Sequence, residues 1–240
     1  MKTAAAILVM ALGIAGCTKS DNGAGDSAAI ADTGAAATAA PATTTADASD
    51  PDANVGGTGL PAGMTGRTDR ADAPITGAKY VKSGDTWEVT TGPAHIAYDA
   101  TKTARGNYTA SATIEQLETP QHPEAFGLFI GGRDLDQPTQ TYTYFLVRGN
   151  GEVLVKVREG DKTRDVIKWT ANKDVPKADA SGKGSYALSA QVTGDAVKFM
   201  VNGKQVASVS KAGLPTDGIA GLRINHNLHV KASPVTISGT

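Results

Sequence analysis

The residues of this chain best suited to hold a ligand are aromatic and polar side chains in its second half. Tyr142 and Tyr144 alternate with other residues of one run, and Arg148 falls on the same side of that run. Trp169 closes a later run, just before a polar loop. Aromatic rings beside a few fixed polar groups suit a carbohydrate or a peptide. The alternative is that the tyrosines only cover a sheet and that Trp169 belongs to the core, because most strand aromatics are structural.

A second group of polar residues lies near the end of the chain: Arg223, Asn225, His226 and His229. We take Arg223 and Asn225 as further candidate ligand-binding residues. His226 and His229 are three positions apart, so on a continuous strand they would point to opposite faces. The sequence offers neither a cysteine nor a nearby carboxylate to complete a zinc set with them. It therefore gives little support to a metal site at these histidines.

Asp134 and Asp136 are the better candidates for metal ligands. They lie in a Gly-rich segment, and the carboxylate and carbonyl oxygens of a loop are the hard ligands that Ca²⁺ prefers. The sequence thus allows a calcium site there. The alternative is that the two aspartates simply form a turn.

Several motifs of catalysis and nucleotide binding are missing. The sequence has no Gly-x-Ser-x-Gly elbow, no P-loop and no dinucleotide fingerprint after a strand. The formal net charge is −1, so no strong field would attract nucleic acid. We expect no nucleic-acid partner, and a binding protein more than an enzyme.

The elements that must position these side chains are predicted to be short strands. Asn202-Gly203 is the strongest turn signal, because a type I′ turn needs positive φ at both central positions, and Gly194-Asp195 suits a similar hairpin. Closely spaced strands joined by tight turns predict an all-β, antiparallel two-sheet sandwich or jelly roll over residues 79–240. Period two with β-branched and aromatic residues recurs in residues 108–114, 141–148, 153–158, 186–192 and 197–201.

Residues 18–78 have a different composition. They consist mainly of Ala, Thr, Gly, Asp and Pro without a sustained period, and all aromatic residues of the chain lie at Tyr80 or later. Such a segment buries too little apolar surface to offset the entropy of ordering it. We therefore expect residues 18–78 to form a disordered tether.

Residues 1–17 have the features of a secretory signal. Lys2 precedes a short apolar run, and small residues lead to Cys17. The run is too short to cross a bilayer of about 30 Å as a helix. Its ending, Ile14-Ala15-Gly16-Cys17, resembles the bacterial lipobox, which implies cleavage before Cys17 and acylation of its sulfur. Cys17 is the one cysteine of the chain, and acylation would consume its thiol; the alternative is an ordinary signal peptide.

The residue after the cysteine bears on the destination. In Gram-negative lipoproteins an aspartate at this position is the usual signal for retention in the inner membrane, whereas this chain has Thr18. The resemblance thus implies a protein of the cell envelope, held on a lipid bilayer by acylated Cys17. We expect the outer membrane if the organism has one.

The order of motifs in residues 79–240 resembles the concanavalin A-like lectin and glucanase jelly roll, especially its laminin-G-like and bacterial lipoprotein members. The resemblance implies a two-sheet jelly roll whose concave sheet often carries aromatics that stack on sugars, often with one calcium ion. The same fold hosts lectins, glycosidases and adhesion modules, so it does not select a ligand. The motifs are Trp87-Glu88-Val89, residues 125–132, Tyr144-Phe145-Leu146-Val147-Arg148, the run 197–201 before Asn202-Gly203, and Gly218-Ile219-Ala220-Gly221-Leu222.

Glycosidases of this fold carry Glu-x-Asp-x-x-Glu or Glu-x-Asp-x-Glu on one strand, which sets two carboxylates beside the glycosidic bond. This chain lacks the motif, and its Glu115 and Glu118 have no aspartate between them. We therefore expect a non-catalytic domain that binds a glycan or another extracellular polymer. The alternatives are a glycoside hydrolase with a different carboxylate pair, and a structural or protein-interaction module of the envelope.

Overall fold

The computed structural model describes residues 53–239, and nearly all of their regular structure is strand. Their one helical element is the 3₁₀ turn η1 (Ile75–Gly77). The strands are β1 (Thr65–Thr68), β2 (Lys79–Ser83), β3 (Thr86–Thr90), β4 (His95–Tyr98), β5 (Thr103–Ala104), β6 (Tyr108–Gln116), β7 (Ala125–Arg133), β8 (Thr141–Arg148), β9 (Glu152–Glu159), β10 (Lys162–Ala171), β11 (Gly184–Thr193), β12 (Ala196–Val201), β13 (Lys204–Ser210), β14 (Gly218–Ile224), β15 (His229–Ala232) and β16 (Thr236–Gly239).

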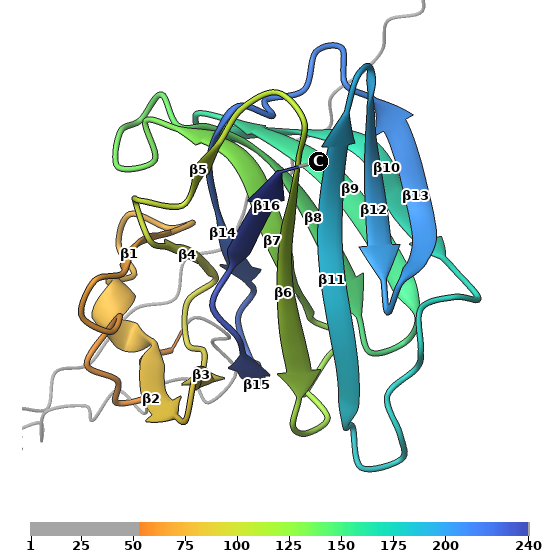
Figure 1. Cartoon of the computed structure of the whole chain (residues 1–240). Helices are drawn as coiled ribbons and strands as arrows, with labels where there is room; N and C mark the ends of the chain where they lie inside the picture. The colour runs from red at the N-terminus through yellow and green to blue at the C-terminus, as the bar shows by residue number, and fades with distance from the viewer. Residues whose placement is uncertain (1–52, 240) are drawn as a thin grey trace, which may run out of the picture. The chain divides into compact units, whose positions relative to one another are not determined.

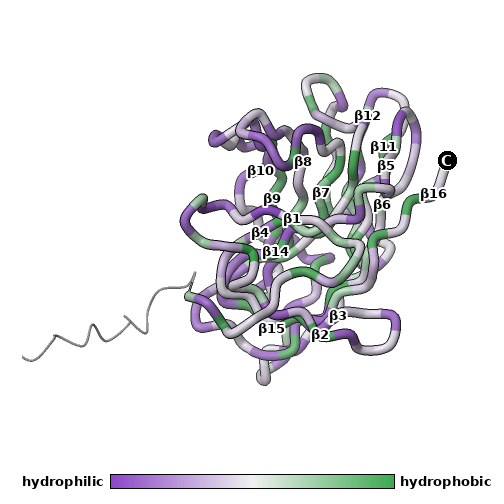
Figure 2. The backbone as a smooth tube through the Cα atoms, turned by 90° about the vertical axis from the view of Figure 1, so that its left-hand side faces the viewer, coloured by the Kyte–Doolittle hydropathy of each residue, from purple (hydrophilic) through white to green (hydrophobic). Residues whose placement is uncertain are grey.

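The strands form two antiparallel sheets that face each other (Figure 1). The β8 sheet has the order β1-β4-β14-β7-β8-β9-β10, and β5 pairs with β14. The β11 sheet has the order β13-β12-β11-β6-β15-β3-β2, and β16 pairs with β6. Figure 2 shows β8, β9 and β10 of one sheet on one side of the molecule and β6, β11 and β16 of the other sheet on the opposite side. The predicted two-sheet all-β sandwich is thus confirmed.

The core lies between the sheets and is built from alternate residues of each strand. Phe126 of β7 meets Tyr186 of β11 with ring centroids 5.2 Å apart, and Phe145 of β8 meets Phe199 of β12 at 5.0 Å. All four side chains are almost fully buried. Aromatic pairs of this kind add to the free energy gained by burial, so they hold the two layers together.

The turn that the sequence predicts most strongly is confirmed. Asn202 and Gly203 both have positive φ, at 49° and 77°, between β12 and β13. The Asn202 side chain also accepts a hydrogen bond from the backbone N–H of Ala187 at 2.7 Å. Gly194 has φ 35° at the hairpin between β11 and β12, as expected.

The expected boundary between tether and domain at residue 79 is too late. Strand β1, at residues 65–68, pairs antiparallel with β4, and Gly59 bridges to Lys79. Backbone hydrogen bonds hold this segment to the sheet edge, so it needs little apolar bulk of its own. Residues 18–52 of the expected tether, and the signal segment with Cys17 and Thr18, lie outside the described residues.

Within residues 53–239, no helix is long and apolar enough to cross a membrane.

Candidate functional site

Tyr142 and Tyr144 lie on the outer face of the β8 sheet, opposite the core residues Phe145 and Val147, as the alternation predicts. Their exposed fractions are only 1% and 7%. Both rings belong to a second apolar cluster and contact each other at a centroid distance of 5.6 Å. The expectation that they offer free faces to a ligand is therefore wrong, because neighbouring side chains of the same face already cover them.

Arg223 of β14 is also committed to the protein. Its side chain is 8% exposed, and its two terminal nitrogens donate to both carboxylate oxygens of Asp69, the Nη1–Oδ1 distance being 2.9 Å. Arg158 of β9 lies 3.5 Å from the same carboxylate. Burial alone would lower the pKa of Arg223, but the Asp69 carboxylate raises it, and the net shift is upward. Arg223 thus fixes residue 69 on the sheet face and has little surface for a ligand.

Arg148 and Trp169 form the part of the predicted site that the structure brings together. The guanidinium carbon of Arg148, at the end of β8, lies 3.7 Å from the centroid of the Trp169 ring on β10. This is a stacked cation–π contact. Nη1 of Arg148 also lies 3.4 Å from Glu152 Oε2. Both members of the stack are partly exposed, unlike the tyrosines.

An open cavity of about 300 Å³ lies beside this stack. Arg148 at the end of β8 forms part of its wall, and the end of β6, the turn after β8 and the loops after β6 and β10 supply the rest. The lining residues are Gln116, residues 119–124, residues 148–150, residues 178–179 and Gly182.

Most of the cavity's side chains are polar. Gln116 is 3% exposed and donates through Nε2 to the carbonyl of Gly182 at 2.6 Å, while its Oε1 has no partner among residues 53–239. Nε of Arg148 likewise finds no partner among the described residues. Hydrogen bonds from Ser181 hold the pKa of the Asp179 carboxyl below its usual value. The cavity therefore combines unused donor and acceptor groups with an anionic carboxylate.

Asn225 lies close to the cavity, against Glu124. Its Nδ2 lies 3.2 Å from Glu124 Oε2. The other carboxylate oxygen of Glu124 lies 2.9 Å from His122 Nδ1 and 2.9 Å from His226 Nε2. The expectation that no carboxylate accompanies His226 is wrong, because Glu124 comes from a loop about a hundred residues earlier. His229 lies apart from this cluster and contacts Glu88 at 2.8 Å.

Asp134 and Asp136 are exposed on either side of the buried Leu135. Asp134 has φ 50°, and its carbonyl accepts a hydrogen bond from the N–H of Gln137 at 2.9 Å. Within residues 53–239, no third His, Cys, Asp or Glu side chain joins them at ligand distance. The segment has the geometry of a turn, and a calcium ion there would depend on backbone carbonyls.

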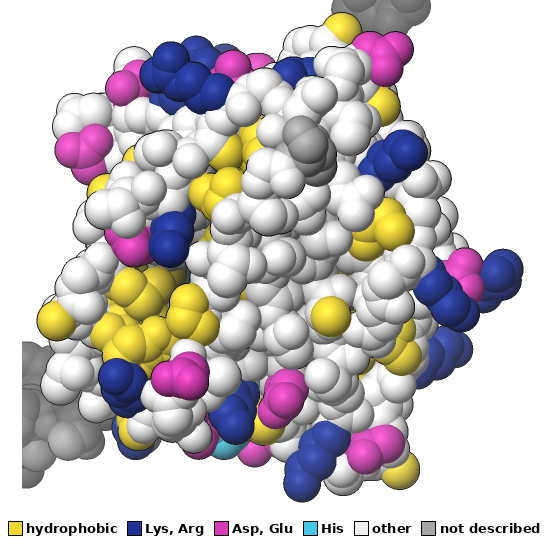
Figure 3. Space-filling view, in the orientation of Figure 1, with side chains coloured by type: hydrophobic (Ala, Val, Ile, Leu, Met, Phe, Trp, Pro, Cys, Tyr) yellow, Lys and Arg dark blue, Asp and Glu magenta, His cyan; other side chains and the backbone are white. Residues whose placement is uncertain are grey.

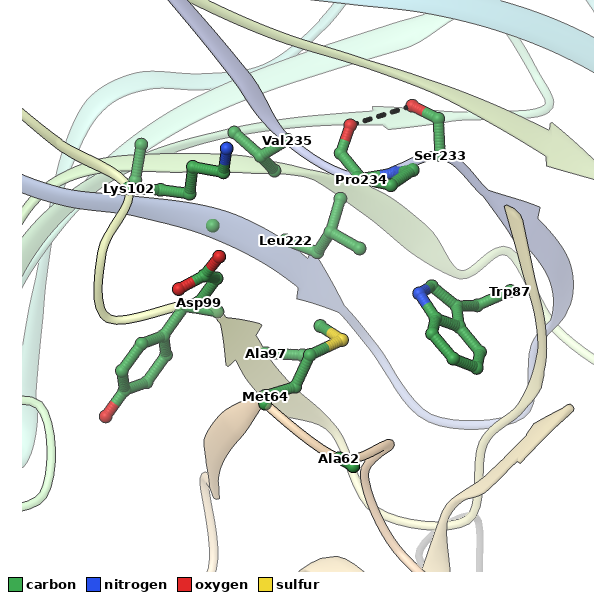
Figure 4. Close-up of a pocket in the computed structure, with 14 residues that line it drawn as sticks. Ala62, Met64, Trp87, Ala97, Asp99, Lys102, Leu222, Ser233, Pro234 and Val235 are labelled. Carbon is green, nitrogen blue, oxygen red and sulfur yellow. Dashed lines mark hydrogen bonds between the residues drawn. The ribbon is translucent and has the colours of Figure 1, made fainter. Parts of the chain in front are cut away.

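A second cavity, of about 200 Å³, opens between β4 and β14 of one sheet and the β15–β16 connection of the other. Figure 4 shows Met64, Leu222 and Trp87 around an apolar floor, with Asp99 and Lys102 at one side. Figure 3 shows apolar side chains gathered on the left of the molecule, in the region of β1 to β4. Trp87 is not among the site residues predicted from the sequence, because a single aromatic residue gives no sign of the cavity around it.

Comparison with solved structures confirms the predicted fold. The chain is similar to the carbohydrate-binding module CBM66 from Bacillus subtilis, with a TM-score of 0.55, 13% identity, and 74% of this chain and 96% of that chain covered. The chain is also similar to an alginate lyase of polysaccharide lyase family 7, A1-II′, with a TM-score of 0.46, 13% identity, and 74% of this chain and 94% of that chain covered. For the Caenorhabditis elegans galectin LEC-6 the TM-score is 0.39 and the identity 13%, with 66% of this chain and 95% of that chain covered.

The residues described here form a concanavalin A-like jelly roll, as the order of motifs in the sequence indicates. No model of a protein family matches this sequence, and no curated protein matches it at a significant level. A sequence identity of 13% is evidence for a shared fold only, so the function has to be argued from the site.

Proposed function

We propose that this domain binds a glycan, and that it does so in the cavity beside Arg148 and Trp169. The observation that carries the proposal is the combination found there. An open cavity of about 300 Å³ adjoins a partly exposed indole–guanidinium stack. A sugar presents apolar C–H faces and a ring of hydroxyl groups, so it needs an aromatic surface and several fixed hydrogen-bonding groups at once.

The side chains proposed to contact the sugar differ from those that the sequence selects. Arg148 and Trp169 remain, Trp169 through its contact with Arg148. Asn150 and Gln116 join them because they line the same cavity as Arg148. The similar fold of CBM66, a carbohydrate-binding module, supports a sugar as ligand in preference to a peptide. The hydroxyls of a sugar can use the carboxylate of Asp179 and the amide of Asn150 as hydrogen-bond partners.

The test is a screen of the purified full-length protein against a panel of polysaccharides, followed by calorimetry on each one that binds. Trp169→Ala and Asn150→Ala are expected to weaken binding at least tenfold. Trp87→Ala is the matched control, because it removes the same side chain from the other cavity. Circular dichroism on each variant separates lost binding from lost folding.

Two results would overturn the proposal. Absence of binding across the whole panel would remove the glycan as the ligand and direct attention to protein partners of the envelope. Binding that Trp87→Ala abolishes, and that Trp169→Ala leaves intact, would move the site to the apolar cavity of Figure 4.

We also propose that the chain is a lipoprotein of the cell envelope, anchored by acylated Cys17. The support is the sequence of residues 1–17: a cationic start, a short apolar run, small residues and one cysteine in register. Such an anchor would hold a glycan-binding domain at a membrane surface, where extracellular polymers are met. Thr18 after the cysteine favours the outer membrane if the organism has one.

A further inference from the structure

Three side chains from two separate loops converge beside the polar cavity, and two of them, His122 and Glu124, line it. His122 and Glu124 belong to the loop between β6 and β7, and His226 belongs to the loop between β14 and β15. One potential ligand atom from each lies within 4.8 Å of the others. The two rings meet edge to face, with centroids 5.6 Å apart. The nitrogens of both rings approach the same carboxylate oxygen.

The spacing of these atoms is close to that of a metal site. Zinc binds histidine nitrogen at about 2.0–2.1 Å and carboxylate oxygen at about 2.0–2.2 Å, usually in a tetrahedral arrangement. Two such ligands then lie about 3.3 Å from each other, by the tetrahedral angle applied to those bond lengths. The two nitrogen–oxygen distances here are 2.9 Å, so each of these pairs would separate by a few tenths of an ångström around an ion. The nitrogens of His122 and His226 lie within 4.8 Å of each other and would adjust to the same spacing.

The surroundings hold the three ligands in place. Glu124 is 8% exposed, and the amide of Asn225 lies at hydrogen-bond distance, 3.2 Å, from its second oxygen. Pro120 and Pro123 flank His122, and proline fixes its own φ and restricts the residue before it. A hydrogen-bonded carboxylate and a stiff loop are the outer support that metal ligands commonly have.

We propose that His122, Glu124 and His226 bind one divalent transition-metal ion of the Zn²⁺ type. Two imidazoles and one carboxylate make a mixed nitrogen–oxygen set, which suits zinc and its neighbours and does not suit Ca²⁺, whose ligands are oxygens. Three protein ligands leave at least one coordination position for water or for a group in the cavity, since His122 and Glu124 line that cavity. The metal site stands on its own geometry and does not depend on glycan binding.

Metal binding would also connect two parts of the fold. The ion would join the loop before β7 to the loop after β14, which the pair Glu124–Asn225 already holds side by side. A ligand that binds only the folded protein raises its stability in proportion to the logarithm of the ligand concentration. We therefore expect Zn²⁺ to raise the unfolding temperature of the protein.

The test is calorimetric titration of ZnCl₂ into untagged, EDTA-treated full-length protein, with CoCl₂ absorption spectra as a second readout. We expect one ion per chain, a dissociation constant in the micromolar range or below, and the intense visible bands of four- or five-coordinate Co²⁺. His122→Ala, His226→Ala and Glu124→Gln are each expected to weaken binding at least tenfold. Asn225→Ala, which leaves the ligands in place, is expected to weaken it about tenfold.

His229→Ala is the matched control, because His229 also contacts a carboxylate, that of Glu88, but has no second histidine beside it. It is expected to bind Zn²⁺ as the unmodified protein does. The proposal is overturned if no ion binds, or if His122→Ala and His226→Ala bind as tightly as the unmodified protein. It is also overturned if His229→Ala loses the ion as strongly as they do. Because His122 is exposed, His122→Ala should fold. It keeps the test decisive even if Glu124→Gln does not fold.

Discussion

The ion pair between Asp69 and Arg223 places two opposite charges on the outer face of the β8 sheet, where the arginine is almost wholly shielded from water. A buried guanidinium is tolerated only while a partner offsets the cost of removing it from water. Asp69 supplies that partner for Arg223 and lies near Arg158 as well. The pair therefore matters for stability more than for recognition.

Asp69→Ala is expected to lower the free energy of unfolding by about 2–4 kcal/mol, because it leaves the Arg223 charge buried and unpaired; the lower end allows for the partial exposure of Asp69. Urea denaturation measures the change. The control is Asp72→Ala, which breaks the exposed pair Arg70–Asp72 and should lower the free energy of unfolding far less, because solvent screens an exposed ion pair. Equal losses in the two variants would contradict this account.

His95 is the one fully buried histidine among the described residues. Its Nδ1 lies 2.8 Å from the carbonyl of Pro93, which can only accept, so Nδ1 carries the proton. Its Nε2 then accepts a hydrogen bond from the Tyr80 hydroxyl at 2.6 Å. Burial lowers the pKa of His95 to about 4, while the nearby charges of Arg223 and Asp69 act in opposite directions. The folded protein thus keeps this imidazole neutral.

Because the pKa of His95 is lower in the folded state than the ordinary value of 6.5, its contribution to stability is complete above pH 6.5. As the pH falls from 6.5 towards 4, His95 binds a proton in the unfolded state but stays neutral in the folded state. We expect a loss of up to about 3 kcal/mol over this window from His95 alone. Urea denaturation at several pH values should show a shallower slope for His95→Gln, and an unchanged slope would contradict the assignment.

At the scale of elements, β1 is a strand that the amino-acid composition of residues 18–78 does not predict. A chain that begins at residue 79 lacks β1, η1 and Asp69, and it exposes the edge of β4. It is expected to lose more stability than Asp69→Ala does and to be recovered poorly in soluble form. A chain that begins at residue 53 keeps all three and should match the full-length protein in urea denaturation. Equal stability of the two truncations would contradict the role given to β1.

The sequence predicts those elements whose signals are local. Residues 141–148 alternate regularly, and β8 has the predicted bounds. Asn202-Gly203 forms the predicted turn, because both residues accept the positive φ that a type I′ turn needs. β1 has four residues and little apolar bulk, so its pairing with β4 leaves no periodic signal.

The candidate site was less predictable for physical reasons. Period two tells which side of a strand Tyr142 faces, but not what packs over that side. Glu124 and His226 lie about a hundred residues apart, and only the pairing of β7 with β14 brings them together. Arg148 and Trp169 could be selected from sequence, because Arg148 shares the face of Tyr142 and Tyr144 on one predicted run and Trp169 closes another run before a polar loop.

At the scale of the whole molecule, we propose that the N-terminal segment anchors the chain and that the β-sandwich binds its ligand. Cys17→Ser is expected to move the protein from the membrane fraction to the soluble fraction and to abolish incorporation of labelled palmitate. Binding of glycan and of Zn²⁺ should be unchanged, because residues 53–239 hold both proposed sites. A variant that stays in the membrane fraction would contradict the anchor.

The four strands at the margins of the two sheets are β1, β10, β2 and β13, and each of them contains a lysine or an arginine. Two further irregularities break the register of β10 against β9. An open sheet margin invites pairing with another chain, and cations and bulges are the usual means of preventing it. If acylated Cys17 concentrates the protein on a membrane, as proposed, copies of the chain would meet often, and these sheet margins would oppose edge-to-edge aggregation.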